Sequence, residues 1–175
     1  MRVLCCLDGS NSELIGQTVA ALAGSYTLCL LYVIDSGPHG KIEMVRARFM
    51  RPHELDAPRR EQMHQAEQIT AQDILAEGLR LLPAAERLVR EGRPEREIAI
   101  CAAEWQADLI ILCSRSQGYG ELPPGPRAVG HVARFVLDHA PCPVLLVRPR
   151  AGKNFSLPGY PKPEKPGHHK PEKRP

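Results

Sequence analysis

The run Arg2-Val3-Leu4-Cys5-Cys6-Leu7 decides the fold, because it is apolar at every position after the first and stops at the turn cluster Asp8-Gly9-Ser10-Asn11. A strand with one solvated face alternates apolar and polar side chains, whereas a strand covered on both faces is apolar throughout. Residues 2–7 are therefore predicted to form a buried strand that ends in a turn. A helix is predicted to follow it, with Asn11 or Ser12 as the capping residue.

Three further apolar runs of strand length follow at residues 26–34, 109–113 and 143–147, and residues 86–90, which end before Gly92, are predicted to form another short strand. Between the runs, apolar residues recur at helical spacing over residues 12–24, 59–82, 94–105 and 129–140. The last of these helices has the most regular core-facing stripe, formed by Val129, Val132, Ala133, Val136, Leu137 and Ala140. Alternating strands and helices, joined by right-handed crossovers, predict an α/β fold with a doubly wound, five-stranded parallel sheet.

The formal net charge of +3 over 175 residues is unevenly distributed. Residues 151–175 hold six Lys or Arg against two Glu, a net charge of +4, and also six prolines. Such a segment buries too little apolar surface to offset the entropy lost on ordering. We predict one domain over residues 1–150 and a disordered Pro/Lys-rich tail over residues 151–175. The diluted charge of the tail favours a solubilising extension, and recruitment of a protein partner by the tail is the alternative.

Composition also limits the class of protein. No apolar run approaches the roughly 18 residues of a membrane span, and the first residues lack the long apolar stretch of a signal peptide. The six cysteines include no CxxC pair and no zinc spacing. We therefore expect a cytoplasmic protein without a metal site or a membrane partner, and the near-neutral domain gives no electrostatic basis for nucleic-acid binding.

Five fragments, in their order and spacing, resemble the universal stress protein family. They are Val3–Ser10, Leu31–Asp35, Gly92–Pro94 with Ile98, Ala107–Arg115, and Val129–Val132 with His139–Pro149. The resemblance covers the predicted domain and not the tail. It implies the strand order 3-2-1-4-5 of an adenine nucleotide alpha hydrolase-like fold. It also implies a homodimer joined through the last strand, here Val144–Arg148.

The resemblance also implies a ligand site beyond the carboxyl ends of the first and fourth strands, where the strand order reverses. ATP-binding members of the family carry Gly-x-x-Gly, nine further residues, and then Gly-Ser or Gly-Thr at this site. The corresponding candidate residues of this chain are Asp8, Val33, Cys113, Arg115, Ser116, Gly130, His131 and Val132.

This chain departs from the ATP-binding pattern at most of its positions. Cys113 and Ser116 stand where the first two glycines are expected, and 13 residues separate Ser116 from Gly130. His131 replaces the Ser or Thr, so Gly130 is the one motif glycine that is kept. Side chains at 113 and 116 take up space and restrict the backbone where phosphates would lie. ATP is the one cofactor that the resemblance implies, and these departures from the pattern disfavour ATP binding. Arg115 and His131 could still neutralise an anion.

Two interpretations of Asp8 stay open at this point. Its carboxylate can hold the ribose or base of a ligand, or it can form a turn by accepting hydrogen bonds from the amides of Ser10 or Asn11. The sequence contains no Ser-His-Asp signature, nucleophile elbow, Walker lysine or HExxH motif, so no catalytic residue is assigned.

Two functional hypotheses therefore remain. The first is a dimeric binding or signalling module of the stress response with a degenerate nucleotide or anion site. The second is an ATP-binding protein that hydrolyses nucleotide slowly or senses adenylates, with Asp8, Arg115 and His131 at its site.

Overall fold

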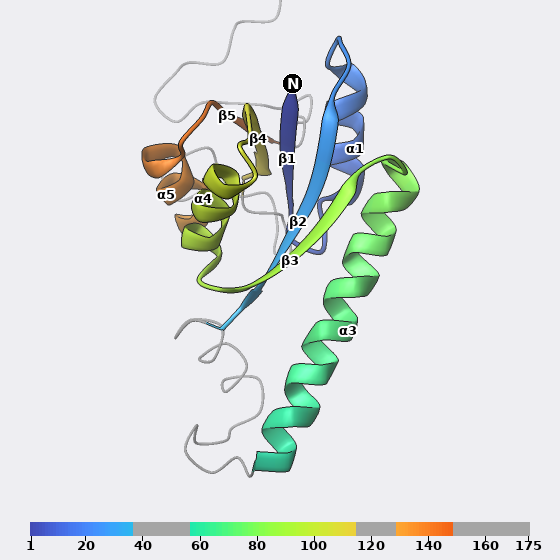
Figure 1. Ribbon diagram of the computed structural model, residues 1–175, viewed down its shortest axis with the longest axis vertical. Coiled ribbons are helices and arrows are strands. Elements are labelled where there is room, and N and C mark those ends of the chain that lie inside the picture. The colour runs from blue at the N-terminus through green and yellow to red at the C-terminus, as the bar shows by residue number, and fades with distance from the viewer. Residues whose placement is uncertain (37–56, 115–128, 149–175) are drawn as a thin grey trace, which may run out of the picture.

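The chain alternates strands and helices along its length, as Figure 1 shows for a computed structural model that describes residues 1–36, 57–114 and 129–148. The elements are β1 (Arg2–Leu7), α1 (Ser12–Ala21), β2 (Thr27–Asp35), α3 (Ala57–Leu81), β3 (Glu86–Gly92), α4 (Pro94–Glu104), β4 (Leu109–Cys113), α5 (His131–His139) and β5 (Val144–Val147). The predicted alternation is confirmed. The predicted tail over residues 151–175 lies outside the described residues.

The five strands form one sheet in the order β3-β2-β1-β4-β5, in which all pairs are parallel. Strand β1 is central and pairs with β2 from Arg2↔Thr27 to Leu7↔Tyr32. On its other side β1 pairs with β4 over only three residues, which end at Cys5↔Ile111. The doubly wound topology and its strand order are thus confirmed, and the order reverses between β1 and β4.

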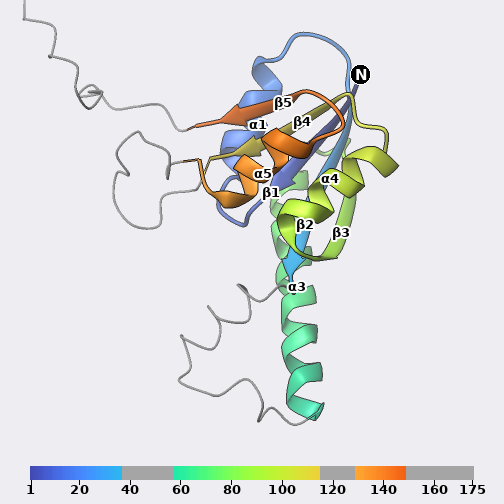
Figure 2. The same cartoon turned by 90° about the vertical axis from the view of Figure 1, so that its left-hand side faces the viewer.

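Helices cover both faces of the sheet, with α1 and α3 on one face and α4 and α5 on the other (Figures 1 and 2). The side chains of β1 divide between the two layers with the period of two that a strand requires. Val3, Cys5 and Leu7 pack with residues of α1 and α3, and Leu4 and Cys6 pack with residues of α4 and α5. This double burial explains why the strand is apolar throughout.

The stripe predicted for the last helix is confirmed at five residues, since Val129, Val132 and Ala140 pack against the core that contains Ala133 and Val136, and it is wrong at the sixth. Ala133 and Val136 are buried, but Leu137 is 45% exposed. Leu137 lies about 100° around the helix from Val136, at the margin of the stripe. Helix α5 precedes the edge strand β5, and the part of the chain that the structure describes places no further helix beyond that edge to cover its flank.

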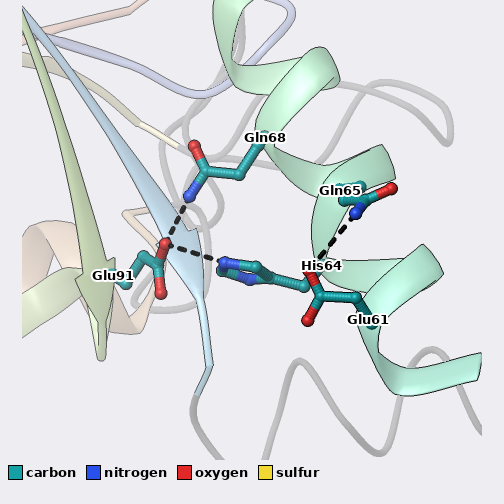
Figure 3. A network of polar contacts seen from close by, with 5 residues as sticks. All are labelled: Glu61, His64, Gln65, Gln68 and Glu91. Carbon is teal, nitrogen blue, oxygen red and sulfur yellow. Dashed lines mark hydrogen bonds and ion pairs between the residues drawn. The ribbon is translucent and has the colours of Figure 1, made fainter. Parts of the chain in front are cut away.

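Helix α3 runs well past the end of the sheet, and a small polar cluster joins the overhanging part to β3 (Figures 1 and 3). The side-chain amide of Gln68 donates a hydrogen bond to Glu91 of β3, and His64 Nε2 lies 3.7 Å from Glu91 Oε1. The side chains of His64 and Glu91 are nearly half exposed, so this ion pair contributes little to stability. No helix in the described part of the chain is long and apolar enough to cross a membrane.

Candidate functional site

A cavity of about 330 Å³ lies at the carboxyl ends of β1, β2 and β4, beside the starts of α4 and α5. This volume falls at the lower end of the range of about 300–1,000 Å³ that is usual for small-molecule sites. Apolar side chains from the core form most of its walls, namely Leu7, Leu31, Ile98, Leu112, Val129 and Ala133. The cavity therefore occupies the reversal point of the strand order, which is where open α/β sheets bind ligands.

Six of the eight predicted site residues line this one cavity. They come from the ends of three strands and the start of one helix, and they are Asp8, Val33, Cys113, Gly130, His131 and Val132. The other two, Arg115 and Ser116, lie outside the described residues. The structure thus brings distant parts of the chain together as predicted, and what these residues do toward a ligand stays a prediction.

Asp8 satisfies the turn interpretation and still faces the cavity. Its Oδ1 accepts hydrogen bonds from the Ser10 backbone N–H at 2.9 Å and from Ser10 Oγ at 3.0 Å. The intervening Gly9 has φ +88°, a backbone conformation that suits glycine. Because a carboxylate has two acceptor oxygens, the turn uses Oδ1 and leaves Oδ2 able to accept a ligand hydroxyl.

Asn11 is a site residue whose role the sequence pattern does not reveal. It precedes α1 at the capping position, but its side chain makes no capping hydrogen bond, so the predicted capping role is wrong for Asn11. Instead its Oδ1 accepts a hydrogen bond from the Asp8 N–H at 3.1 Å, and its Nδ2 donates to the Cys6 carbonyl at 3.1 Å. In the sequence, the only indication of this role is that an Asn follows three residues after the Asp at the end of a strand. An N-cap residue before a helix produces the same pattern, so the sequence does not distinguish the two roles.

The cavity wall contains two thiols, and both are neutral near pH 7. Burial raises the pKa of Cys113 to about 11, although a hydrogen bond with the Asn11 side chain partly opposes it. Burial also raises the pKa of Cys6 well above its ordinary value. A nucleophilic cysteine needs a lowered pKa, so these thiols act as part of the apolar wall. Within the described residues no group of three His, Cys, Asp or Glu is placed to hold a metal ion.

Helix α5 begins at the cavity with its backbone N–H groups. Gly130, at the N-cap position, has φ +81°, and among the residues that the structure describes no side chain caps this helix. His131 is the first helical residue and is exposed beside the cavity. The first N–H groups of a helix have no partner within the helix and carry the positive end of its dipole, so they favour a negatively charged group. By contrast, α4 starts at the cavity with Pro94, which has no N–H to donate.

A five-stranded parallel sheet with helices on both faces defines a doubly wound α/β protein, and its cavity lies at the reversal point of the strand order, where such sheets bind ligands. The sequence model of the universal stress protein family matches residues 1–148. This chain belongs to the universal stress protein family.

Individual relatives agree with this assignment. The "universal stress protein in QAH/OAS sulfhydrylase 3′ region" of Thermus aquaticus is 35% identical over 86 residues, which span 49% of this chain and 58% of that protein. The crystal structure of hypothetical protein PH0823 is 22% identical with a TM-score of 0.61, and the match covers 86% of this chain and 97% of that one. A universal stress protein family protein from Arabidopsis thaliana, crystallised with AMP bound, is 15% identical with a TM-score of 0.55 over 86% of this chain and 93% of that one. At these identities the two structures establish the fold.

Proposed function

We propose that this chain is a binding and signalling module of the stress response that takes a nucleotide or a similar small anion into the cavity between β1 and β4. The observation that carries the proposal is the shared lining of one cavity by Asp8, Val33, Cys113 and the start of α5. A usable site requires that these groups surround an open cavity. If a side chain filled this space, no ligand could enter and the residues would have only a structural role.

The chemistry of the lining fits a nucleoside that carries few phosphates. The apolar walls suit a flat base, Asp8 can accept hydrogen bonds from ribose hydroxyls, and the start of α5 suits one phosphate. Among the described residues that line the cavity there is no Lys or Arg, and Asp8 would repel a highly charged ligand. AMP, which the Arabidopsis relative binds, is therefore the first probe.

ATP is the alternative ligand, and the Cys113 side chain argues against it. Cys113 lies at the end of β4 and lines the cavity, at the position where the family's ATP-binding pattern has glycine. The proposal is accordingly a degenerate site that has lost room for a triphosphate. Tight ATP binding, with or without slow hydrolysis, would instead support the adenylate-sensing hypothesis.

Equilibrium dialysis of the full chain against AMP, ADP and ATP tests this proposal. We expect AMP to bind and its affinity to exceed that of ATP. ATP binding in the low micromolar range would contradict the degenerate site, and no binding of any of the three would contradict a nucleotide site. A Leu137→Ser variant, altered on the exposed side of α5, serves as a control and should bind AMP like the unmodified chain.

We also propose that two copies pair through residues 144–148. Strand β5 is an edge strand, and all four of its residues are partly exposed although each is apolar. An exposed apolar edge readily pairs with another strand. Light scattering coupled to size-exclusion chromatography should show a dimer, and Leu145→Lys should yield a monomer, whereas Leu137→Lys on α5 should not. A monomeric unmodified chain would contradict this assembly.

The charge distribution gives the tail a separate proposed role. Residues 151–175 carry a net charge of +4 and the rest of the chain is close to neutral. A protein partner attracted by charge should be lost when residues 151–175 are deleted, whereas AMP binding should be retained. Loss of AMP binding in the deleted chain would contradict this division.

A further inference from the structure

The cavity exists because β1 and β4 separate before either strand ends. Their pairing stops at Cys5↔Ile111, but β1 continues to Leu7 alongside β2, and β4 continues to Cys113 alongside β5. Beyond this point the two halves of the sheet diverge. The backbone groups of β1 that face the gap therefore lack a strand partner there.

The side chain of Asn11 occupies this gap. Its amide bonds the Cys6 carbonyl and the Asp8 N–H, each at 3.1 Å. In a parallel pair, one residue of the neighbouring strand bonds a carbonyl and an N–H that lie two residues apart. The Asn11 side-chain amide has the same donor and acceptor as a peptide group. It therefore continues the hydrogen-bond ladder of β1 beyond the point where β4 ceases to pair with β1.

The environment of Asn11 makes this arrangement costly to replace. Asn11 is 4% exposed, and it lines the cavity together with Cys113 at the end of β4. A buried carbonyl or N–H that loses its partner is destabilised, because water cannot replace the lost hydrogen bond. Aspartate has the same shape as asparagine but lacks the donor, so it would place two acceptors against each other at the Cys6 carbonyl.

We infer that Asn11 is the positioning residue of the ligand site. It fixes the separation of β1 and β4, and thereby holds the Asp8 carboxylate at the cavity and the Cys113 thiol in its wall. The effect on ligand affinity rests on the proposed function, whereas the effect on cavity shape does not.

Two variants and two readouts test the inference on the full chain. Asn11→Ala removes both hydrogen bonds, and Asn11→Asp removes the donor while it keeps the acceptor for the Asp8 N–H. The first readout is labelling by N-ethylmaleimide, followed by mass spectrometry. The second is the dissociation constant of AMP.

The chain supplies its own reference for the labelling. Cys113 lines the cavity, whereas Cys142, which is also partly buried, does not. Thr18→Ala is the matched control variant, since it also removes one side-chain bond to the backbone, from Thr18 Oγ1 to the Leu14 carbonyl, at a position that does not line the cavity.

In both Asn11 variants we expect Cys113 to be labelled at least tenfold faster, with Cys142 unchanged, and AMP to bind at least tenfold more weakly. Thr18→Ala should leave the labelling of Cys113 and the AMP affinity within twofold. If Asn11→Ala does not fold, Asn11→Asp provides both readouts.

Unchanged labelling of Cys113 in the Asn11 variants would overturn the inference. Faster labelling of Cys113 and Cys142 by the same factor would also overturn it, because that result describes a general loosening. If the unmodified chain does not bind AMP, the proposed nucleotide site fails, and the labelling of Cys113 relative to Cys142 alone decides the role of Asn11.

Discussion

The two ends of the sheet differ in what fills the space beyond the strands. At the amino end, the Arg2 guanidinium lies 4.2 Å from the centre of the Trp105 ring, and Trp105 Nε1 donates to Glu86 Oε2 at 3.1 Å. Two hydrogen bonds join Arg2 and Asp108 there. The Arg2 N–H donates to Asp108 Oδ2 at 2.7 Å, and the Asp108 N–H donates to the Arg2 carbonyl at 2.8 Å. Large side chains and short connections close this end.

At the carboxyl end, the strands β1 and β4 separate and a single small amide, that of Asn11, lies between them. The space beyond is the cavity of about 330 Å³. At the amino end Trp105 bonds Glu86 and Arg2 bonds Asp108, whereas Asp8 and the start of α5 face the cavity. If the proposed function is correct, the amino end of the sheet contributes stability and the carboxyl end contributes binding, and changes at the two ends should have separable effects.

The largest expected effect comes from alkaline pH, which ionises thiols at both ends. Burial raises the pKa of Cys29, near Arg2 and Glu86, from 9.0 to about 12, and that of Cys113 to about 11. The unfolded chain releases these protons near pH 9, before the folded chain does, so the stabilisation is complete below pH 9 and is lost as the pH rises toward 11 and 12. At about 1.4 kcal/mol for each pKa unit, the free energy of unfolding should fall by about 3 kcal/mol or more.

Urea unfolding at several pH values from 7 to 11 measures this fall. A Cys29→Ala variant should show a smaller decrease, because it retains only the contributions of the other buried thiols. A free energy of unfolding that stays constant from pH 8 to pH 11 would contradict the raised pKa values.

The next effect is expected at the closed end. Trp105→Ala removes the ring on which Arg2 stacks and the donor to Glu86, and should lower the free energy of unfolding by about 3 kcal/mol. The AMP dissociation constant should stay within twofold at a temperature where the variant is folded. Loss of AMP affinity without loss of stability would break the division between the two ends.

A matched pair of aspartate variants sharpens the same division. Asp8→Asn should weaken AMP binding about tenfold, which is about 1.4 kcal/mol, and change stability little, because the amide oxygen can still accept the bond from Ser10 N–H. Asp108→Asn should cost about 1 kcal/mol of stability through its weaker bond to Arg2 N–H and leave AMP binding unchanged. Calorimetric titration gives the AMP dissociation constant of each variant, and chemical unfolding gives its free energy of unfolding. If Asp8→Asn lowered stability and Asp108→Asn weakened AMP binding, the assigned roles of the two residues would be refuted.

The smallest effect is expected at Leu137, which the sequence pattern places in the core. Because this side chain is 45% exposed, Leu137→Ser should change the free energy of unfolding by no more than about 0.5 kcal/mol. Val136→Ser, at the neighbouring buried position, should be destabilised several times more. If urea unfolding showed the same decrease in free energy for both variants, the sequence-based prediction that Leu137 lies in the core would be correct after all.

The sequence by itself determined the alternation of strands and helices, because uniformly apolar runs require cover on both faces. Through the resemblance it also provided the strand order and, with it, the meeting of Asp8, Val33, Cys113 and the start of the Gly130 helix. These features could be predicted since they depend on local pattern and on the rule that parallel strands bring their carboxyl ends to one edge.

Only the tertiary structure decided what Asn11 does, since its two hydrogen bonds exist because β1 and β4 separate after Cys5, a property of two strands more than 100 residues apart. The same holds for Leu137, whose exposure follows from the position of α5 at the edge of the sheet. A hydrogen bond or a buried face depends on which neighbour is present, and periodicity along the chain carries no information about that neighbour.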